Sequence, residues 1–168
     1  MPGSPTDPGA PPVTVAVTRS DYLWFVDRAL DEMMGIVDDL GDEAANRRPP
    51  LAGANAPFAI LTHCLGVMEY WGGATVAGRP VRRDRNAEFV AQGAVADLRT
   101  RVDQARRQFR ADVDGADGTA VPSQVVRDPA DPVPYSERTA AVLLHVLEEL
   151  YQHLGQMELS RDLLRASP

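Results

Sequence analysis

The chain has no lysine and only one cysteine, Cys64, among its 168 residues. A single cysteine excludes an intrachain disulfide, so we expect a reducing compartment, the cytoplasm. All 17 basic residues are arginines, and 24 acidic residues outnumber them, which gives a formal net charge of −7. An acidic chain without a basic block predicts that the protein does not bind nucleic acid.

Long apolar runs are also absent. No stretch reaches the roughly 20 apolar residues that a membrane-spanning helix needs, so we expect no membrane association. The start, MPGSPTDPGAPPV, has neither the positive nor the apolar region of a secretory signal. Residues 1–17 are rich in proline and glycine and are expected to form a disordered tail, which leaves residues 18–168 as one domain.

The sequence is instead dominated by helical periodicity. Apolar residues recur at three- and four-residue steps, and the expected helices cover about residues 20–40, 55–77, 94–113 and 138–165. Gly41 is a stop signal for the first helix, and Asn55 is a natural N-cap for the second. The pattern predicts an all-α fold, an antiparallel four-helix bundle with a long connection, about 22 residues, before the last helix.

Arginines and aspartates alternate on the expected third helix. The arginines are Arg99, Arg101, Arg106, Arg107 and Arg110, and the aspartates are Asp97, Asp103 and Asp112. Such mixing of the two charge signs favours a solvated helix face over a nucleic-acid surface.

The last expected helix contains many side chains that can bind a metal, in the run LLHVLEELYQHLGQMEL at residues 143–159. At about 100° per residue, five apolar side chains define its core-facing sector: Leu143, Leu147, Leu150, Leu154 and Met157. Relative to that sector, Glu148 points away, His145 lies toward solvent, and Glu149 and His153 lean inward. Because Glu149 and His153 are four residues apart, both can converge on one ion.

A third ligand must come from another helix, and His63 is the remaining histidine. It lies on a mostly apolar stripe of the second expected helix, together with Tyr70. A buried imidazole requires a hydrogen-bond partner or a metal, so the alternative is a core histidine satisfied by a carbonyl or by Glu149. Two imidazoles and one carboxylate suit Zn²⁺ and can also hold Fe²⁺ or Ni²⁺. Cys64 points about 100° away around the helix and is expected to be a small buried hydrophobe.

These residues resemble the DinB-like superfamily over about residues 18–165. The likeness rests on Asn55 and His63, on Glu69 and Trp71 one to two turns later, and on the run HVLEELYQHLGQ. Within the superfamily the chain is most similar to the mycothiol-dependent branch, the mycothiol S-transferases, which includes the amino-terminal domain of mycothiol-dependent maleylpyruvate isomerase.

The resemblance implies a set of metal ligands. Most DinB-like proteins carry three metal-binding histidines, whereas the isomerase branch has a glutamate in one of these places. By that correspondence the ligands are His63, Glu149 and His153, and the divalent metal is zinc. Gly155 costs about 1 kcal/mol relative to alanine inside a helix, so it predicts a close approach of backbone or ligand.

Other polar residues are expected around the ligands. Three of them support the metal site or line its pocket: His145, Gln156 and Tyr70. The loop GRPVRRDRNAEF contributes Arg82, Arg83 and Arg85. These arginines either hold carboxylates of a cofactor or substrate or are solvated charges.

The function that the resemblance implies is metal-dependent thiol S-transfer or a related detoxification reaction. The metal would activate a low-molecular-weight thiol such as mycothiol toward an electrophile. The isomerase has a second, carboxy-terminal domain, whereas this chain ends at Pro168, so isomerase activity itself is not expected. The alternatives are a non-catalytic metal-binding protein of the stress response and a purely structural bundle. Exposed apolar edges of such a bundle also allow a homodimer.

Overall fold

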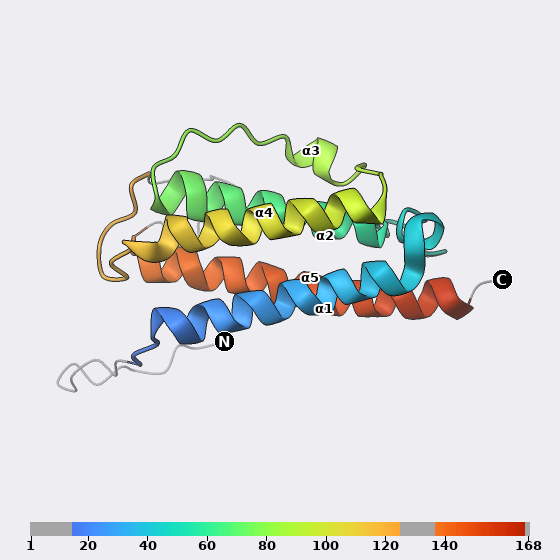
Figure 1. The fold of residues 1–168 in the computed structure, drawn as a ribbon, viewed down its shortest axis with the longest axis horizontal. Helices are drawn as coiled ribbons and strands as arrows, with labels where there is room; N and C mark the ends of the chain where they lie inside the picture. Colours follow the sequence, from blue (N-terminus) through green and yellow to red (C-terminus); the bar gives the residue numbers. More distant parts are fainter. Residues whose placement is uncertain (1–14, 125–136, 167–168) are drawn as a thin grey trace, which may run out of the picture.

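The computed structural model describes residues 15–124 and 137–166. In these ranges the chain forms helices and no strands. The helices are α1 (Arg19–Ala45), α2 (Pro57–Val67), the π-helix η1 (Met68–Val76), α3 (Arg85–Glu88), α4 (Val95–Asp114) and α5 (Thr139–Ala166). The predicted all-α bundle is confirmed (Figure 1). Most of the predicted tail, and residues 125–136 of the predicted long connection, lie outside the described residues.

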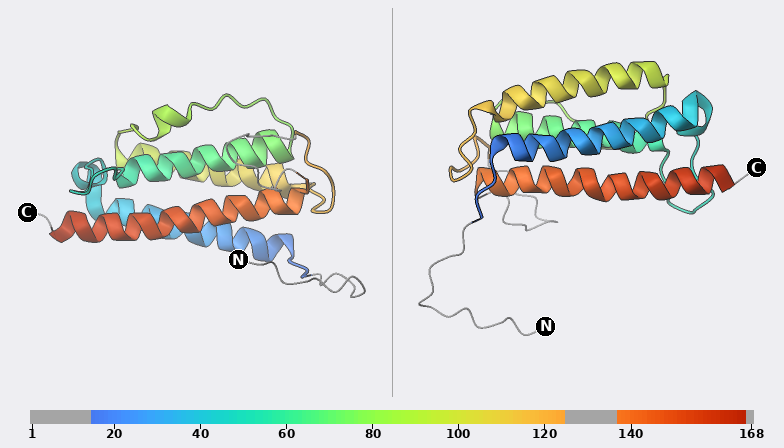
Figure 2. Two further views of the ribbon diagram at one scale, coloured as in Figure 1. Left: turned by 180° about the vertical axis from the view of Figure 1, so that it is seen from behind. Right: turned by 60° about the horizontal axis from the view of Figure 1, so that its bottom comes forward.

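The four long helical segments lie side by side along the molecule (Figures 1 and 2). α1 and α2 run in opposite directions, and so do α4 and α5. α2 and α4 run in the same direction, because residues 77–94, here called the crossing segment, carry the chain back along the outside of the bundle. α5 packs against α1, α2 and η1, so the helix of Glu149 and His153 lies beside the helix of His63.

The helix boundaries differ from the prediction at two places. Gly41 has φ 67, a conformation that favours glycine, and it kinks α1, which continues to Ala45. The predicted end of the helix is therefore a bend. α2 begins at Pro57 after the N-cap Ala56, with no side-chain cap, so the predicted capping role of Asn55 is wrong. Proline has no N–H group that needs a cap, which makes it suitable in the first turn.

The core contains apolar side chains from all four long segments. The largest that are almost fully buried include Leu30, Met33, Ile60, Leu61, Met68, Leu98, Phe109, Leu150 and Met157. Each such side chain stabilises the fold by about 1.5–3 kcal/mol through its burial. In the part of the chain that the structure describes, no helix combines the length and the apolar character needed to cross a membrane.

The second predicted helix changes from α to π geometry at Met68. At its end the N–H of Ala77 bonds the carbonyl of Gly72, five residues earlier, at 2.9 Å. A Cβ atom on Gly72 would lie 2.4 Å from Cε2 of Phe109, so this glycine lets the α4 ring pack directly on the π-helix. π-helical turns concentrate at functional sites, and this one carries Tyr70 and Trp71.

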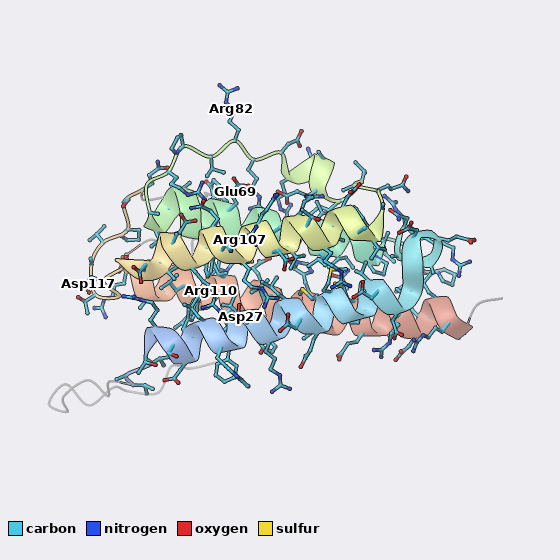
Figure 3. The ribbon with its side chains drawn as sticks, viewed as in Figure 1. Asp27, Glu69, Arg82, Arg107, Arg110 and Asp117 are labelled. Carbon is cyan, nitrogen blue, oxygen red and sulfur yellow. The ribbon has the colours of Figure 1, made fainter. Side chains whose placement is uncertain are left out.

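The arginines of α4 pair in part with aspartates of α1. Arg106 lies 2.5 Å from Asp31, and Arg110 contacts Asp27. Figure 3 shows Arg110 and Asp27 at the seam between the two helices. The predicted solvated face is therefore also an ion-pair surface between helices, and such partly exposed pairs each contribute little stability.

The buried face of α5 differs from the predicted sector. Leu143 and Leu147 are only half-buried, whereas Val142 and Val146 are completely buried. The reason is that α5 packs against α1 on one side and against α2 and η1 on the other, which widens and turns its buried face. His145 is consequently 9% exposed, and its predicted position on the solvated face is wrong.

Candidate metal centre

His63 lies in the middle of α2 with 1% of its surface exposed, and residues of the crossing segment hold its ring. Its Nδ1 lies 2.8 Å from Oε2 of Glu88. The ring also stacks on Phe89, with centroids 4.3 Å apart and an interplanar angle of 26°. Since Arg83 pairs with both oxygens of Glu88, at 2.8 Å and 2.9 Å, this carboxylate acts as an acceptor. Nη2 of Arg83 also lies 3.3 Å from Nδ1 of His63, but the contact with Glu88 is the shorter one, so Nδ1 is assigned as the donor and the lone pair lies on Nε2.

His153 lies on α5, one turn after Glu149, and Gln156 holds its ring. Nδ1 of His153 donates to Oε1 of Gln156 at 2.8 Å. The Nε2 atoms of both histidines point to one oxygen, Oε2 of Glu149, which lies 3.4 Å from His153 and 3.5 Å from His63. One ligand atom from each of these three residues lies within 4.8 Å of the others, a spacing that can hold a metal ion.

The surroundings of Nε2 of His63 indicate whether the site fits a metal. This atom is buried and makes no hydrogen bond to any described residue. Buried polar atoms are almost always satisfied, and a cation at the focus of the three ligand atoms would satisfy this one. Two imidazole nitrogens and a carboxylate oxygen are a typical zinc donor set. Metal-binding histidines also usually donate their other N–H to a carboxylate or carbonyl, as His63 and His153 do here.

The three side chains shift each other's pKa. The neighbouring imidazoles of His153, and then of His63, hold the pKa of Glu149 well below its usual range, although burial opposes this shift. Burial disfavours the charge on His153, but hydrogen bonds with Glu149 and Gln156 outweigh it and raise the pKa of His153. Without a metal, both shifts favour an ion pair between Glu149 and His153.

This ion pair predicts how the stability of the metal-free protein depends on pH. The lowered pKa of Glu149 stabilises the fold above its ordinary value of 4.5, and this stability is lost as the pH falls through the lowered pKa. The raised pKa of His153 stabilises the fold below its ordinary value of 6.5, and this stability is lost as the pH rises through the raised pKa. The difference in melting temperature between wild type and Glu149→Gln should therefore be largest between pH 4.5 and 6.5.

Thermal melting of chelator-treated protein across the pH range measures this difference. Metal affinity should behave differently and rise steadily with pH, because the metal binds the deprotonated ligands. A difference in melting temperature that stays constant from acid to alkaline pH would contradict the predicted ion pair.

Two further predicted residues, His145 and Tyr70, have different neighbours near the candidate ligands. The ring of His145 meets Trp71 edge-on, with centroids 5.0 Å apart, and its Nε2 lies 3.9 Å from Oε1 of Glu149. Tyr70 is half-buried, and the guanidinium of Arg83 lies over its ring at 5.6 Å. His145 therefore lies next to Glu149, whereas Tyr70 lies next to Arg83, whose Nη2 is 3.3 Å from Nδ1 of His63.

The arginines of the crossing segment have three different environments. Arg82 is exposed and extends outward into solvent (Figure 3). Arg83 points inward and pairs with Glu88. Arg85 is exposed and lies over the ring of Phe89 at 5.2 Å, and its charge acts on His153. Of the two arginines predicted to bind anions, Arg85 is therefore the one whose charge reaches a candidate ligand, His153.

Sequence reasoning missed Glu88 and Phe89, because it treated residues 78–89 as a loop. The segment contains α3, and the side chain of Asp84 caps this short helix by accepting from the N–H of Ala87 at 3.0 Å. The available signal was a capping aspartate before Arg85–Glu88. Cys64 behaves as predicted: it is completely buried, and burial raises the pKa of its thiol far above the usual range.

Gly155 on α5 does not face a neighbouring backbone. A Cβ atom at this position would have no atom within 4 Å, so the predicted close approach of backbone is wrong. We expect Gly155→Ala to stabilise the protein by about 0.5–1 kcal/mol, because alanine loses less backbone entropy in a helix. Urea unfolding measures this gain. Gly35→Ala on α1 is the matched control, since its Cβ also meets open space. A destabilised Gly155→Ala variant beside a stabilised Gly35→Ala variant would contradict the prediction.

The fold and the cluster define a class of protein: an all-helical bundle with a candidate metal centre of two histidines and one glutamate between two of its helices. The family model of the mycothiol S-transferases matches residues 22–166, which include all three candidate ligands and the crossing segment. The chain therefore belongs to the mycothiol S-transferase family, and the resemblance found in its sequence is confirmed. Comparisons with the curated proteins and with the solved structures gave no match.

Proposed function

We propose that this protein is a metal-dependent thiol S-transferase whose metal is held by His63, Glu149 and His153. The observation that carries the proposal is the convergence of three ligand atoms within 4.8 Å, one of them the buried Nε2 of His63, which no described residue satisfies. Membership of the mycothiol S-transferase family supports mycothiol as the thiol. The donor set favours zinc, with Ni²⁺ and Fe²⁺ as the other candidates, and the single cysteine favours a cytoplasmic enzyme.

The side chains of the site have distinct tasks in this proposal. A divalent ion would supply its charge, which lowers the pKa of a bound thiol so that thiolate is present at neutral pH. Glu149 contributes the negative ligand. Gln156 and Glu88 each hold one imidazole through Nδ1, so that both Nε2 atoms face Glu149. The site is thus organised before the thiol arrives.

The transfer itself joins the thiol sulfur to an electrophilic carbon. A new S–C bond forms while the bond from that carbon to its leaving group breaks, and the leaving group takes the electron pair. The thiol proton is released to solvent. Arg85 is exposed beside the ligands, and we propose that it binds a carboxylate of the thiol or of the electrophile.

Metal analysis of protein purified without an affinity tag is the first test, and we expect about one divalent ion per chain. The second test is turnover with mycothiol and an electrophile, either an epoxide or a haloalkyl probe. Chelator should abolish this activity, and Zn²⁺, Ni²⁺ and Fe²⁺ should be compared for its recovery. A protein that binds no metal even after reconstitution would exclude the proposal. A protein that binds metal but transfers no thiol would support the alternative, a non-catalytic metal-binding protein.

A further inference from the structure

Glu88 and Arg83 form a nearly buried ion pair directly behind the candidate ligand His63. The exposed fractions of their side chains are 10% for Glu88 and 15% for Arg83, and that of His63 is 2%. Arg83 engages both carboxylate oxygens, while Oε2 also accepts the proton on Nδ1 of His63. Burying two charges has a large desolvation cost, so such a pair is weak evidence for a role in stability. Its contact with His63 indicates a role in positioning.

Gly66 makes room for this ion pair. It follows His63 by three residues on α2, and a Cβ atom there would lie 2.1 Å from Oε1 and 2.6 Å from Cδ of Glu88. Any larger residue would have to push the carboxylate away from its present position. A glycine inside a helix costs about 1 kcal/mol relative to alanine, and here it lies where Glu88 reaches the helix.

The partners of the two histidines differ in charge. His153 donates to the neutral amide oxygen of Gln156 on its own helix, whereas His63 donates to a carboxylate from another element. A charged acceptor makes a stronger hydrogen bond than a neutral one and increases the basicity of the imidazole. The Phe89 ring stacked on His63 limits the remaining rotation of that imidazole.

We propose that Glu88, held by Arg83, is a positioning residue of the metal centre. It keeps the proton of His63 on Nδ1 and directs Nε2 toward Glu149 and His153. The inference rests on the proposed function, because it assumes that His63 binds a divalent ion. Through Glu88, the crossing segment helps to orient His63, although this segment contributes none of the three candidate ligands.

Zinc titration of the metal-free protein against a competing chelator tests this role without measuring activity. We expect Glu88→Gln to weaken zinc binding about 10–100-fold, the usual effect of losing such a partner. Asp84→Asn is the matched control: it also removes one negative charge from this segment, but Asp84 caps α3 and does not bond His63. Its zinc affinity should stay within about threefold of wild type, as expected for a residue that does not support a ligand.

Gly66→Ala gives a second test that leaves every charge in place. The added methyl group must displace the Glu88 carboxylate, so zinc binding should weaken at least about tenfold. Nitrogen-15 chemical shifts of the imidazoles in metal-free protein report the tautomer directly. Wild type should carry the His63 proton on Nδ1, and Gly66→Ala should show a mixture of the two tautomers.

The outcomes separate this inference from the proposed function. Tight zinc binding by wild type, with Glu88→Gln within about threefold of it, overturns the positioning role and leaves the function standing. A wild-type protein that binds none of Zn²⁺, Ni²⁺ and Fe²⁺ overturns both. If Glu88→Gln does not fold, the chemical shifts decide, and a His63 proton on Nε2 in the wild type overturns the inference.

Discussion

His153→Ala is expected to weaken zinc binding by about 100-fold or more and to remove thiol transfer. Structural zinc sites with four ligands bind with about 10–16 kcal/mol, which is roughly 2.5–4 kcal/mol for each ligand. A loss of about 2.7 kcal/mol in binding free energy corresponds to a dissociation constant about 100-fold larger. Nε2 of His153 faces the same carboxylate oxygen as Nε2 of His63, and no other described histidine occupies this position.

Competition titration with a chelator and elemental analysis measure this loss. Gln152→Ala is the control, because Gln152 precedes His153 on α5 but is exposed. It should keep one ion per chain and wild-type transfer. A His153→Ala protein that still binds one ion tightly would show that the metal centre is elsewhere.

Arg79→Met is expected to destabilise the fold by about 3–5 kcal/mol, because it leaves a buried carboxylate without its partner. The Asp112 side chain on α4 is only 3% exposed. It accepts from Nε of Arg79 at 2.7 Å, from Nη2 of Arg79 at 2.9 Å and from Gln108 at 2.9 Å. Without Arg79, a single neutral donor remains for this charge. The pair also fixes the start of the crossing segment against α4, so its loss should loosen the path that leads to Glu88.

Thermal melting measures the effect. For a domain of this size we expect the melting temperature to fall by about 6–20 °C. Arg82→Met is the control, because this arginine is exposed and extends into solvent (Figure 3), and it should change stability by less than about 0.5 kcal/mol. Replacing Arg79 and Asp112 together with apolar residues should be less harmful than Arg79→Met alone, since no unpaired charge then remains. A single variant that melts like wild type would contradict the prediction.

Much of the fold follows from local patterns in the sequence. Helical periodicity predicted α1, α4 and α5 within a few residues, because an amphipathic helix repeats its apolar face over short distances. The pair Glu149 and His153 could be recognised for the same reason, since side chains four residues apart lie on one helix face. His63 could be selected because it is the one histidine of the sequence outside the last helix.

The structure differs from the sequence prediction where contacts between residues far apart in the sequence decide the outcome. The change to π geometry in η1 accompanies the packing of Phe109 on Gly72, which no periodicity reveals. The burial of His145 depends on the packing of α5 against α1 and against α2 and η1. The inward position of Arg83 depends on Glu88, which approaches α2 from the crossing segment.

The sequence by itself determined the helices and the residue types that can form a metal centre, because both are properties of spacing along one helix. Only the tertiary structure decided which nitrogen of each ring faces the centre, and which residue holds the other nitrogen. Gln156 is three residues from His153, but Glu88 is 25 residues from His63. The orientation of an imidazole depends on its hydrogen-bond partner, and for His63 that partner comes from a segment brought close only by the path of the chain.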